Sequence, residues 1–317
     1  MVALIRVETN GSFVFIVGSP RSGTTLLGDI LNCHRAVSWW YEPYFVWDRH
    51  FREFPHDERT AEDATPKVRN QIHSDFLRYR KKTGCKIILD KSPRNSLKIP
   101  FIKEIFPQAR FIHILRDGRD ATLSIHKEWI RRKEIVNDPS NNSRFNYKNA
   151  GLVVREWLGR QYFLKDQLRA FWFETHGHFI NMSVHLNRLR WNGAVGWGPR
   201  FRNWQDTLKR TTMLQFNAYQ WLRCVESIRK SWSEIPDENK LLISYEELIS
   251  VSGKKILEIL EFLDLKHYKG FFDSTPRLKR HNFNKWKREF TAEQIRIIKP
   301  ILAPLIDELG YAKPEEW

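Results

Sequence analysis

The hydrophobic positions along the chain form two kinds of pattern. Apolar residues recur at helical spacing over residues 24–33, 95–106, 120–132 and 246–263. Between these segments lie short apolar runs, which are typical of strands buried on both faces of a parallel sheet. The runs occupy residues 13–17, 36–40, 86–89, 110–115 and 241–244. Strands that alternate with helices predict a three-layer α/β fold, in which helices flank a central, mostly parallel sheet of about five strands.

The segment 133–212 departs from this alternation. It opens with the polar stretch "NDPSNNSRFN" and then becomes rich in aromatic residues and arginines. Within it, "WNGAVGWGPRFRNW" (191–204) combines three tryptophans with four glycines or prolines, which predicts an irregular, aromatic-lined loop. We interpret 133–212 as an insertion over the ligand-binding edge of the sheet, within a single domain spanning residues 1–317. A helical subdomain that only extends the core is the alternative.

The C-terminal segment carries clear helix signals. The sequence "TAEQ" that begins at Thr291 is a capping box, and Gly310 is placed to end the helix. Pro300 and Pro304 are predicted to kink or split it.

The chain of 317 residues carries a net charge of +16. This charge favours an anionic partner, such as a nucleotide, an acidic glycan or the surface of a membrane, although it also serves solubility alone. The basic residues are scattered rather than gathered in one block, so we expect no nucleic-acid partner. No apolar run is long enough to span a bilayer, and no signal-peptide pattern precedes the first strand, so we expect a cytoplasmic protein. The three cysteines lack metal-ligand spacing, and no metal is predicted.

The stretch "GSPRSGTTLL" (18–27) is a glycine-rich loop between an apolar strand and an apolar helix, as in P-loop proteins. Main-chain N–H groups in such a loop, together with the N-terminus of the helix, form a site for a phosphate group. Arg21 and the hydroxyl groups of the loop add side-chain donors. P-loop triphosphatases carry lysine where this chain has Thr24, which disfavours triphosphate hydrolysis.

A second motif, "FIHILRDGRDATLS" (111–124), places Arg116 and Ser124 after another apolar strand, about 95 residues beyond the loop. Together the two motifs resemble those of sulfotransferases that use 3′-phosphoadenylyl sulfate (PAPS). The resemblance extends to "LLISYEEL" and "NKWKREFT" near the C-terminus, covers nearly the whole chain, and is weakest between residues 133 and 240. It implies a P-loop-like sulfotransferase domain with PAPS as cofactor and PAP as product.

The resemblance also implies roles in donor binding. The loop would hold the 5′-phosphosulfate through Ser19, Arg21, Ser22, Gly23, Thr24 and Thr25. Arg116 and Ser124 would bind the 3′-phosphate, with Arg119 as a further contact, and Tyr245 would contact the adenine. Lys279 and Arg280 match a basic loop that closes over the 3′-phosphate, although the glycines usual there are absent. The structural alternatives are an ion pair of Arg116 with Asp117 or Asp120, and a place in the core for Tyr245.

The catalytic residues are inferred in the same way. Lys91 in "LDKSPRN" is the candidate for stabilising the leaving group, together with Arg21. Cytosolic small-molecule sulfotransferases have a histidine base two residues after this lysine, where this chain has Pro93. Instead, "WWYEPYF" places Glu42 after the second strand, which resembles the glutamate base of tyrosylprotein and heparan sulfate sulfotransferases. His34 and His126 are alternative bases, and a loop arginine is an alternative partner for Glu42.

The order of strands and polar residues supports one shared site. Gly18, Glu42, Lys91, Arg116 and Tyr245 each follow a different predicted strand. Ligands of open α/β sheets bind at the carboxyl ends of the strands, so these residues are expected to converge there.

We therefore expect a PAPS-dependent sulfotransferase in which Glu42 is the general base for in-line attack by an acceptor hydroxyl. The aromatic, arginine-rich insertion favours a carbohydrate or glycolipid acceptor, because sugars stack on tryptophan rings. A tyrosine, another phenol or a lipid remains open as acceptor, as do peripheral membrane contact and the oligomeric state. The alternative functions are a nucleotide kinase-like P-loop phosphotransferase and a non-catalytic protein that binds an anionic glycan or lipid.

Overall fold

The computed structural model describes residues 12–51, 54–137, 191, 196–276, 283–311 and 316–317. The chain divides into two compact units, one made of residues 1–125 with 198–317 and the other of residues 126–197. Much of the predicted insertion at 133–212 lies outside the described residues, so its role stays a prediction.

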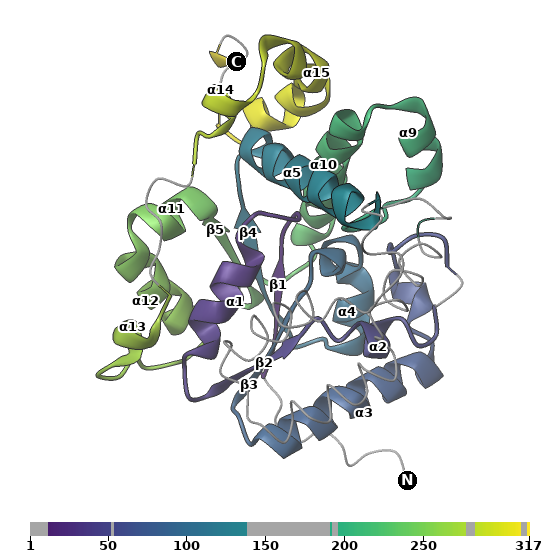
Figure 1. The fold of residues 1–317 in the computed structure, drawn as a ribbon. Helices are drawn as coiled ribbons and strands as arrows, with labels where there is room; N and C mark the ends of the chain where they lie inside the picture. The colour runs from purple at the N-terminus through teal and green to yellow at the C-terminus, as the bar shows by residue number, and fades with distance from the viewer. Residues whose placement is uncertain (1–11, 52–53, 138–190, 192–195, 277–282, 312–315) are drawn as a thin grey trace. The chain divides into compact units, whose positions relative to one another are not determined.

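The first unit is built on a five-stranded sheet in which every neighbouring pair is parallel (Figure 1). The strand order is β2-β3-β1-β4-β5. The strands are β1 (Phe13–Val17), β2 (Val37–Tyr41), β3 (Ile87–Lys91), β4 (Arg110–Leu115) and β5 (Lys240–Ser244). All five predicted strands are confirmed, with bounds that differ by two residues at most, and so is the predicted α/β fold.

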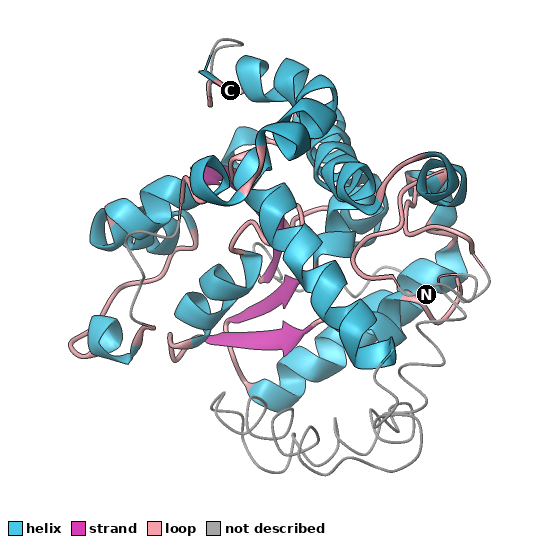
Figure 2. Ribbon diagram, turned by 45° about the horizontal axis from the view of Figure 1, so that its top comes forward, coloured by secondary structure: helices cyan, strands magenta, loops and turns pink. Residues whose placement is uncertain are grey.

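Alternate residues of the strands pack against helices on opposite faces of the sheet, so that the strands lie between helical layers (Figure 2). From β1, Val14 and Ile16 join one core cluster, whereas Phe13, Phe15 and Val17 join the other. The first cluster includes side chains of α1 (Thr24–Asn32), α11 (Tyr245–Ser250) and α12 (Ser252–Phe262). The second includes side chains of α2 (Tyr44–Trp47), α3 (Pro66–Thr83), α4 (Ile99–Ile105) and α10 (Met213–Trp232).

Two predicted helices prove to be two elements each. The segment 95–106 begins in a 3₁₀ turn, η2 (Pro93–Leu97), and continues as α4, while 246–263 is divided between α11 and α12 near Val251. The helix predicted at 120–132 is part of the longer α5 (Gly118–Asn137). The remaining described elements are η1 (Ala61–Asp63), α9 (Trp204–Arg210), η4 (Asp237–Asn239), α13 (Phe271–Ser274), α14 (Trp286–Glu289) and α15 (Ala292–Glu308). Among the helices that the structure describes, none is long and apolar enough to cross a membrane.

The C-terminal helix α15 is a single helix that contains both Pro300 and Pro304, so the predicted split is wrong. Both prolines are exposed, while Ile298 and Leu302 on the other face are buried. Burial of that face outweighs the hydrogen bonds that the two prolines cannot donate. The capping box at Thr291 is confirmed.

The loop predicted to be aromatic-lined is irregular over residues 196–203. Its described aromatic side chains mostly point into the protein: Trp191 and Trp204 are each 1% exposed, and the ring of Phe201 stacks on that of Phe216. The indole N–H of Trp204 donates to the carbonyl of Pro55 at 2.6 Å. These three residues therefore stabilise packing rather than offering open stacking surfaces.

Candidate active site

The candidate residues lie where the strands of the first unit end. Gly18, Glu42, Arg116 and Tyr245 directly follow β1, β2, β4 and β5, and Lys91 is the last residue of β3. In the sheet register, Lys91 pairs with Ile16 of β1 on one side and with Tyr41 of β2 on the other. The glycine-rich loop and Glu42 therefore emerge on either side of Lys91, at the carboxyl edge of the sheet.

The loop between β1 and α1 is fixed by its glycines and by a serine from η2. The Gly18 N–H donates to Ser96 Oγ at 3.0 Å, and the same hydroxyl donates to the Gly18 carbonyl at 2.9 Å. A Cβ at Gly18 would lie only 2.6 Å from the Ile114 carbonyl oxygen. Gly23 has a left-handed φ of +92° and caps α1, whose first residues are Thr24 and Thr25. The loop therefore leads directly into a helix N-terminus, which is a favourable place for an anion.

Within this loop, Ser19 and Ser22 are buried and hydrogen-bond to each other through their hydroxyl groups. Arg21, by contrast, is exposed and has a φ of +65°. Its Nε donates to Ser124 Oγ of α5 at 3.0 Å. The loop thus reaches the second predicted motif through Arg21.

Arg116, which belongs to that motif, makes a second contact with the loop. Its guanidinium donates to the Arg21 carbonyl at 2.8 Å and lies 4.5 Å above the ring of Tyr245. Arg21, Arg116, Ser124 and Tyr245 therefore form one connected cluster, although they come from three separate segments of the chain. Any anion bound at the loop would lie near two guanidinium groups.

The structural alternatives for this cluster are also present. An Arg116 nitrogen lies 3.7 Å from an oxygen of Asp120, whose carboxyl pKa is raised by burial. Tyr245 is 4% exposed and packs against Gly23, where a Cβ would come within 2.4 Å of its ring. Arg116 and Tyr245 are therefore both buried, and both lie at the carboxyl edge of the sheet, where a ligand could contact them.

Arg119 is engaged elsewhere. Its guanidinium donates to both carboxylate oxygens of Asp117, with distances of 2.8 to 3.2 Å, and lies 4.1 Å above the ring of Trp286. It therefore ties α5 to the C-terminal segment, and the expected further phosphate contact gains no support from this geometry.

Glu42 and Lys91 form a close ion pair. Lys91 Nζ donates to Glu42 Oε1 at 2.6 Å, and the two side chains are 2% and 19% exposed, respectively. The ammonium group also lies 5.2 Å from the centre of the Tyr41 ring. The partner of Glu42 is thus Lys91 rather than a loop arginine. Glu42 has a φ of +41°, a left-handed conformation that is strained for a residue other than glycine and is often found at functional sites.

Three further side chains surround Glu42 that sequence reasoning did not single out. The Tyr44 hydroxyl donates to Glu42 Oε2 at 2.8 Å, and Ser92 Oγ donates to the Tyr44 oxygen at 3.3 Å. The Arg94 guanidinium lies 3.7 Å above the Tyr44 ring. Burial and the charge of Glu42 raise the pKa of Tyr44 well above its usual value, which keeps this hydroxyl protonated. The sequence signal that could have identified them is their closeness to Glu42 in "EPY" and to Lys91 in "KSPR".

The structure lends no support to the remaining candidates. Lys279 and Arg280 lie outside the described residues. Both ring nitrogens of His34 are engaged, with Nε2 3.1 Å from the Lys266 carbonyl oxygen and Nδ1 accepting from the Ala36 N–H, so His34 is a poor candidate for the base. His126 belongs to the second unit. Among the described residues, no cluster of three or more His, Cys, Asp or Glu side chains could hold a metal ion.

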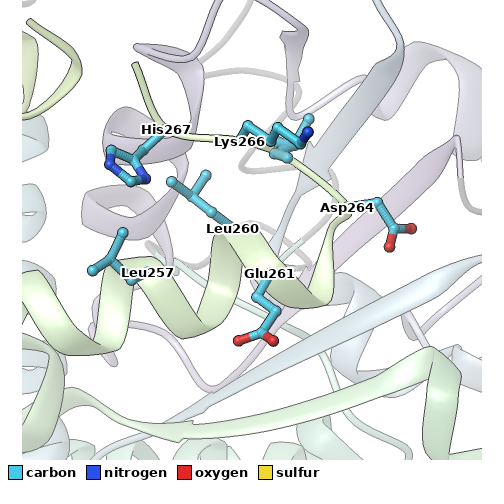
Figure 3. Close-up of a pocket in the computed structure, with 7 residues that line it drawn as sticks. Leu257, Leu260, Glu261, Asp264, Lys266 and His267 are labelled. Carbon is cyan, nitrogen blue, oxygen red and sulfur yellow. The ribbon is translucent and has the colours of Figure 1, made fainter. Parts of the chain in front are cut away.

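A separate hollow of about 660 Å³ lies beside the C-terminal end of α12 (Figure 3). It is lined by Leu257, Leu260, Glu261, Asp264, Leu265, Lys266 and His267. The carbonyl of Asp264 accepts a hydrogen bond from Lys86, and its carboxylate pairs with Arg110. Lys86 and Arg110 lie at the amino ends of β3 and β4, so the hollow is at the opposite edge of the sheet from Glu42 and the loop.

Comparisons with known proteins identify the family and the fold. A family model described as the sulfotransferase family matches residues 13–172. Protein-tyrosine sulfotransferase A of Caenorhabditis elegans is 30% identical over 132 residues, which cover 36% of this chain and 32% of that protein. Protein-tyrosine sulfotransferase 1 of Danio rerio is 30% identical over 135 residues, covering 39% and 37%. The chain thus spans about a third of the length of these curated relatives.

The solved sulfotransferase domain from the curacin biosynthetic pathway has the same fold. It superposes with a TM-score of 0.57 at 12% identity, and the match covers 96% of this chain and 99% of that domain.

Proposed function

The chain belongs to the sulfotransferase family, and from this premise we propose that it transfers the sulfuryl group of PAPS to an acceptor hydroxyl. The observation that carries the proposal is the arrangement of two groups of side chains at one edge of the sheet. One is the loop with Arg21, Arg116 and Ser124, and the other is the Glu42–Lys91 pair. The first group suits the anionic donor, and the second suits the reacting atoms.

In the proposed donor site, the loop amides and the hydroxyls of Ser19, Ser22, Thr24 and Thr25 bind the 5′-phosphosulfate. The helix N-terminus that follows Gly23 favours its negative charge. Arg116 and Ser124 bind the 3′-phosphate, and Tyr245 contacts the adenine. The described residues support this assignment through the guanidinium of Arg116, which is aligned by the Tyr245 ring and the Arg21 carbonyl.

The proposed reaction is an in-line displacement at sulfur. The acceptor oxygen forms a new bond to sulfur, while the bond from sulfur to the phosphate oxygen breaks and leaves its electron pair on that oxygen, giving PAP. Glu42 takes the proton of the acceptor hydroxyl. Lys91, Arg21 and the loop amides stabilise the charge on the leaving oxygen. These cationic groups make a metal ion unnecessary in the proposal.

For the acceptor we propose a tyrosine side chain. Two relatives that match at 30% identity are named protein-tyrosine sulfotransferases. In addition, the side chains of Tyr41 and Phe45, which flank Glu42 in the sequence, are 39% and 49% exposed and offer aromatic contact surface for a phenol ring. The carbohydrate or glycolipid acceptor favoured by the composition of 133–212 stays a prediction, as does a cytoplasmic location.

Calorimetry tests the donor. We expect the protein to bind PAP more tightly than ADP or ATP, because only PAP carries the 3′-phosphate for Arg116. Tight binding of ATP without binding of PAP would instead indicate the kinase-like alternative.

Turnover tests the base and the acceptor. Glu42→Gln should lower transfer from radiolabelled PAPS by about 10²- to 10⁴-fold, the usual contribution of a general base, while the affinity for PAP stays nearly unchanged. A screen over tyrosine peptides, simple phenols, glycans and lipids identifies the acceptor. Undiminished turnover by Glu42→Gln would exclude Glu42 as the base, and absence of turnover with every acceptor class would favour a binding protein.

A further inference from the structure

Each oxygen of the Glu42 carboxylate has its own partner. Oε1 accepts from Lys91 Nζ at 2.6 Å, and Oε2 accepts from the Tyr44 hydroxyl at 2.8 Å. Lys91 and Tyr44 have different roles in the proposed function. Lys91 is required at the leaving oxygen of the donor, whereas Tyr44 has no part in that reaction.

We propose that Tyr44 is a positioning residue for Glu42: it holds Oε2 in place while Lys91 exchanges Oε1 for the leaving oxygen, so that Oε1 is the atom that receives the acceptor proton. This inference rests on the proposed function, in which Glu42 is the base.

The surroundings of Tyr44 suit it to this role, because its ring and its hydroxyl are both held. The Arg94 guanidinium covers the ring at 3.7 Å, and Arg94 is itself paired with Asp48 at 2.9 Å. Ser92 donates to the phenol oxygen, which leaves the phenol proton directed at Glu42. A phenol held in this way orients the carboxylate and remains neutral. A second cation in its place would also offset the negative charge of the carboxylate.

The backbone adds a second constraint. Glu42 has the strained φ of +41°, and the Tyr44 N–H donates to the Glu42 carbonyl at 2.6 Å across Pro43. A strained conformation persists only where surrounding contacts maintain it. The hydrogen bonds from Tyr44 to the main chain and side chain of Glu42 are two such contacts, so the turn and the carboxylate orientation are maintained together.

During transfer, the proton balance is simple. The acceptor O–H bond breaks as the oxygen–sulfur bond forms, and the proton moves to Glu42 Oε1. The bond from sulfur to the phosphate oxygen breaks with its electron pair, and the Lys91 ammonium stabilises that oxygen. Tyr44 keeps its own proton throughout and donates it to Oε2 as a hydrogen bond before and after the step.

The pH dependence of turnover separates this role from mere packing. The charged or titratable groups that act on Glu42 are Lys91 and Asp90 of β3, Arg94 of η2 and Tyr44 itself. Tyr44→Phe leaves the other three and the stacked ring in place and removes the phenol hydroxyl, with its hydrogen bond to the carboxylate and the one it accepts from Ser92. Because a donor stabilises the ionised carboxylate, its loss should move the acid limb of the kcat/KM profile to higher pH.

The test compares Tyr44→Phe with Tyr268→Phe, each assayed with radiolabelled PAPS and the best acceptor. We expect Tyr44→Phe to lower kcat by about 10- to 100-fold, the range for one hydrogen bond to a charged group, and to shift the acid limb upward. The KM for PAPS and the affinity for PAP should stay unchanged. Tyr268→Phe is the matched control, because its hydroxyl donates to a main-chain carbonyl, that of Cys33, at 3.0 Å. It should change neither kcat nor the limb.

The outcomes distinguish this inference from the proposed function. If Glu42→Gln is inactive but Tyr44→Phe keeps the wild-type kcat and acid limb, the positioning role is wrong and the base assignment stands. If Glu42→Gln remains active, the base assignment itself has failed. Should Tyr44→Phe not fold, Ser92→Ala removes the donor to the Tyr44 oxygen and should shift the same limb in the same direction. An unmoved limb in that variant would overturn the role.

Discussion

Substitution of Gly23 by alanine should disrupt the candidate donor site from within. Gly23 has a φ of +92°, and a Cβ at this position would lie 2.4 Å from Cδ2 and 2.9 Å from Cε2 of Tyr245. The ring cannot easily withdraw, because it is 4% exposed and is covered by the Arg116 guanidinium at 4.5 Å. The alanine therefore introduces two separate costs, one in the backbone and one in packing.

The two costs can be estimated and then separated. A left-handed conformation costs a non-glycine residue about 1–2 kcal/mol, and overpacking a filled site costs about 1–3 kcal/mol. We therefore expect Gly23→Ala to lower the free energy of unfolding by about 2–5 kcal/mol. Gly84→Ala is the matched control: Gly84 also has a positive φ, +67°, but its Cβ would meet no atom within 4 Å. Only the backbone cost of about 1–2 kcal/mol applies there.

Urea denaturation of both variants measures these differences, and calorimetry with PAP measures the effect on the site. Gly23→Ala should weaken PAP binding, because movement of the Tyr245 ring displaces Arg116, whereas Gly84→Ala should not. In a Tyr245→Ala background the clash with the ring disappears and only the 3.2 Å approach to Ile114 Cδ1 remains, so the cost of Gly23→Ala should fall close to that of Gly84→Ala. Equal destabilisation by the two alanines in the wild-type background would refute the role of the Tyr245 contact.

Two further predictions concern charge. Arg116→Ala should weaken binding of PAP by at least about tenfold while leaving a nucleotide without a 3′-phosphate much less affected, as measured by calorimetry. Equal losses would place Arg116 away from the 3′-phosphate. Burial lowers the pKa of His113 to about 3, so the folded protein holds a neutral imidazole. Its contribution to stability is present above the unfolded pKa of about 6.5 and is lost as the pH falls below it, by about 1.4 kcal/mol per pH unit. Urea denaturation from pH 7 to pH 5 should show that the free energy of unfolding falls more steeply with pH for the wild type than for His113→Gln. An equal fall in both proteins would contradict a buried, neutral imidazole at His113.

The sheet could be predicted from sequence because its strands are buried on both faces. All residues of β1 and β3 are buried, so β1 appears as an unbroken apolar run and β3 begins with one that lasts until Asp90. Helix α3 shows the opposite case. Its buried apolar positions, Val68, Ile72 and Phe76, form only a narrow stripe in an otherwise polar, basic segment. Such a helix depends on tertiary packing rather than on an evident local pattern, and it was not predicted.

The site was predictable at the level of the main chain but not of side-chain partners. Each strand end could be located, and the fold rule for open α/β sheets then brought these ends together. The pairing of Glu42 with Lys91, however, depends on the register between β2 and β3, in which Tyr41 lies opposite Lys91. A shift of one residue would turn the side chains to opposite faces, and no local sequence signal fixes that register. The contact with Tyr44 depends in addition on the left-handed turn at Glu42.

The structural roles of Arg116 and Tyr245 are compatible with the donor-binding roles that we propose for them. Two guanidinium groups close to an anion site repel each other and must be held in place before any ligand compensates them. The Tyr245 ring, the Arg21 carbonyl and Asp120 supply that support for Arg116. An arginine fixed in this way loses little conformational freedom on binding, so more of its attraction for a phosphate is retained as affinity. The ion pair with Asp120, first considered as an alternative to donor binding, is therefore consistent with a guanidinium prepared for it.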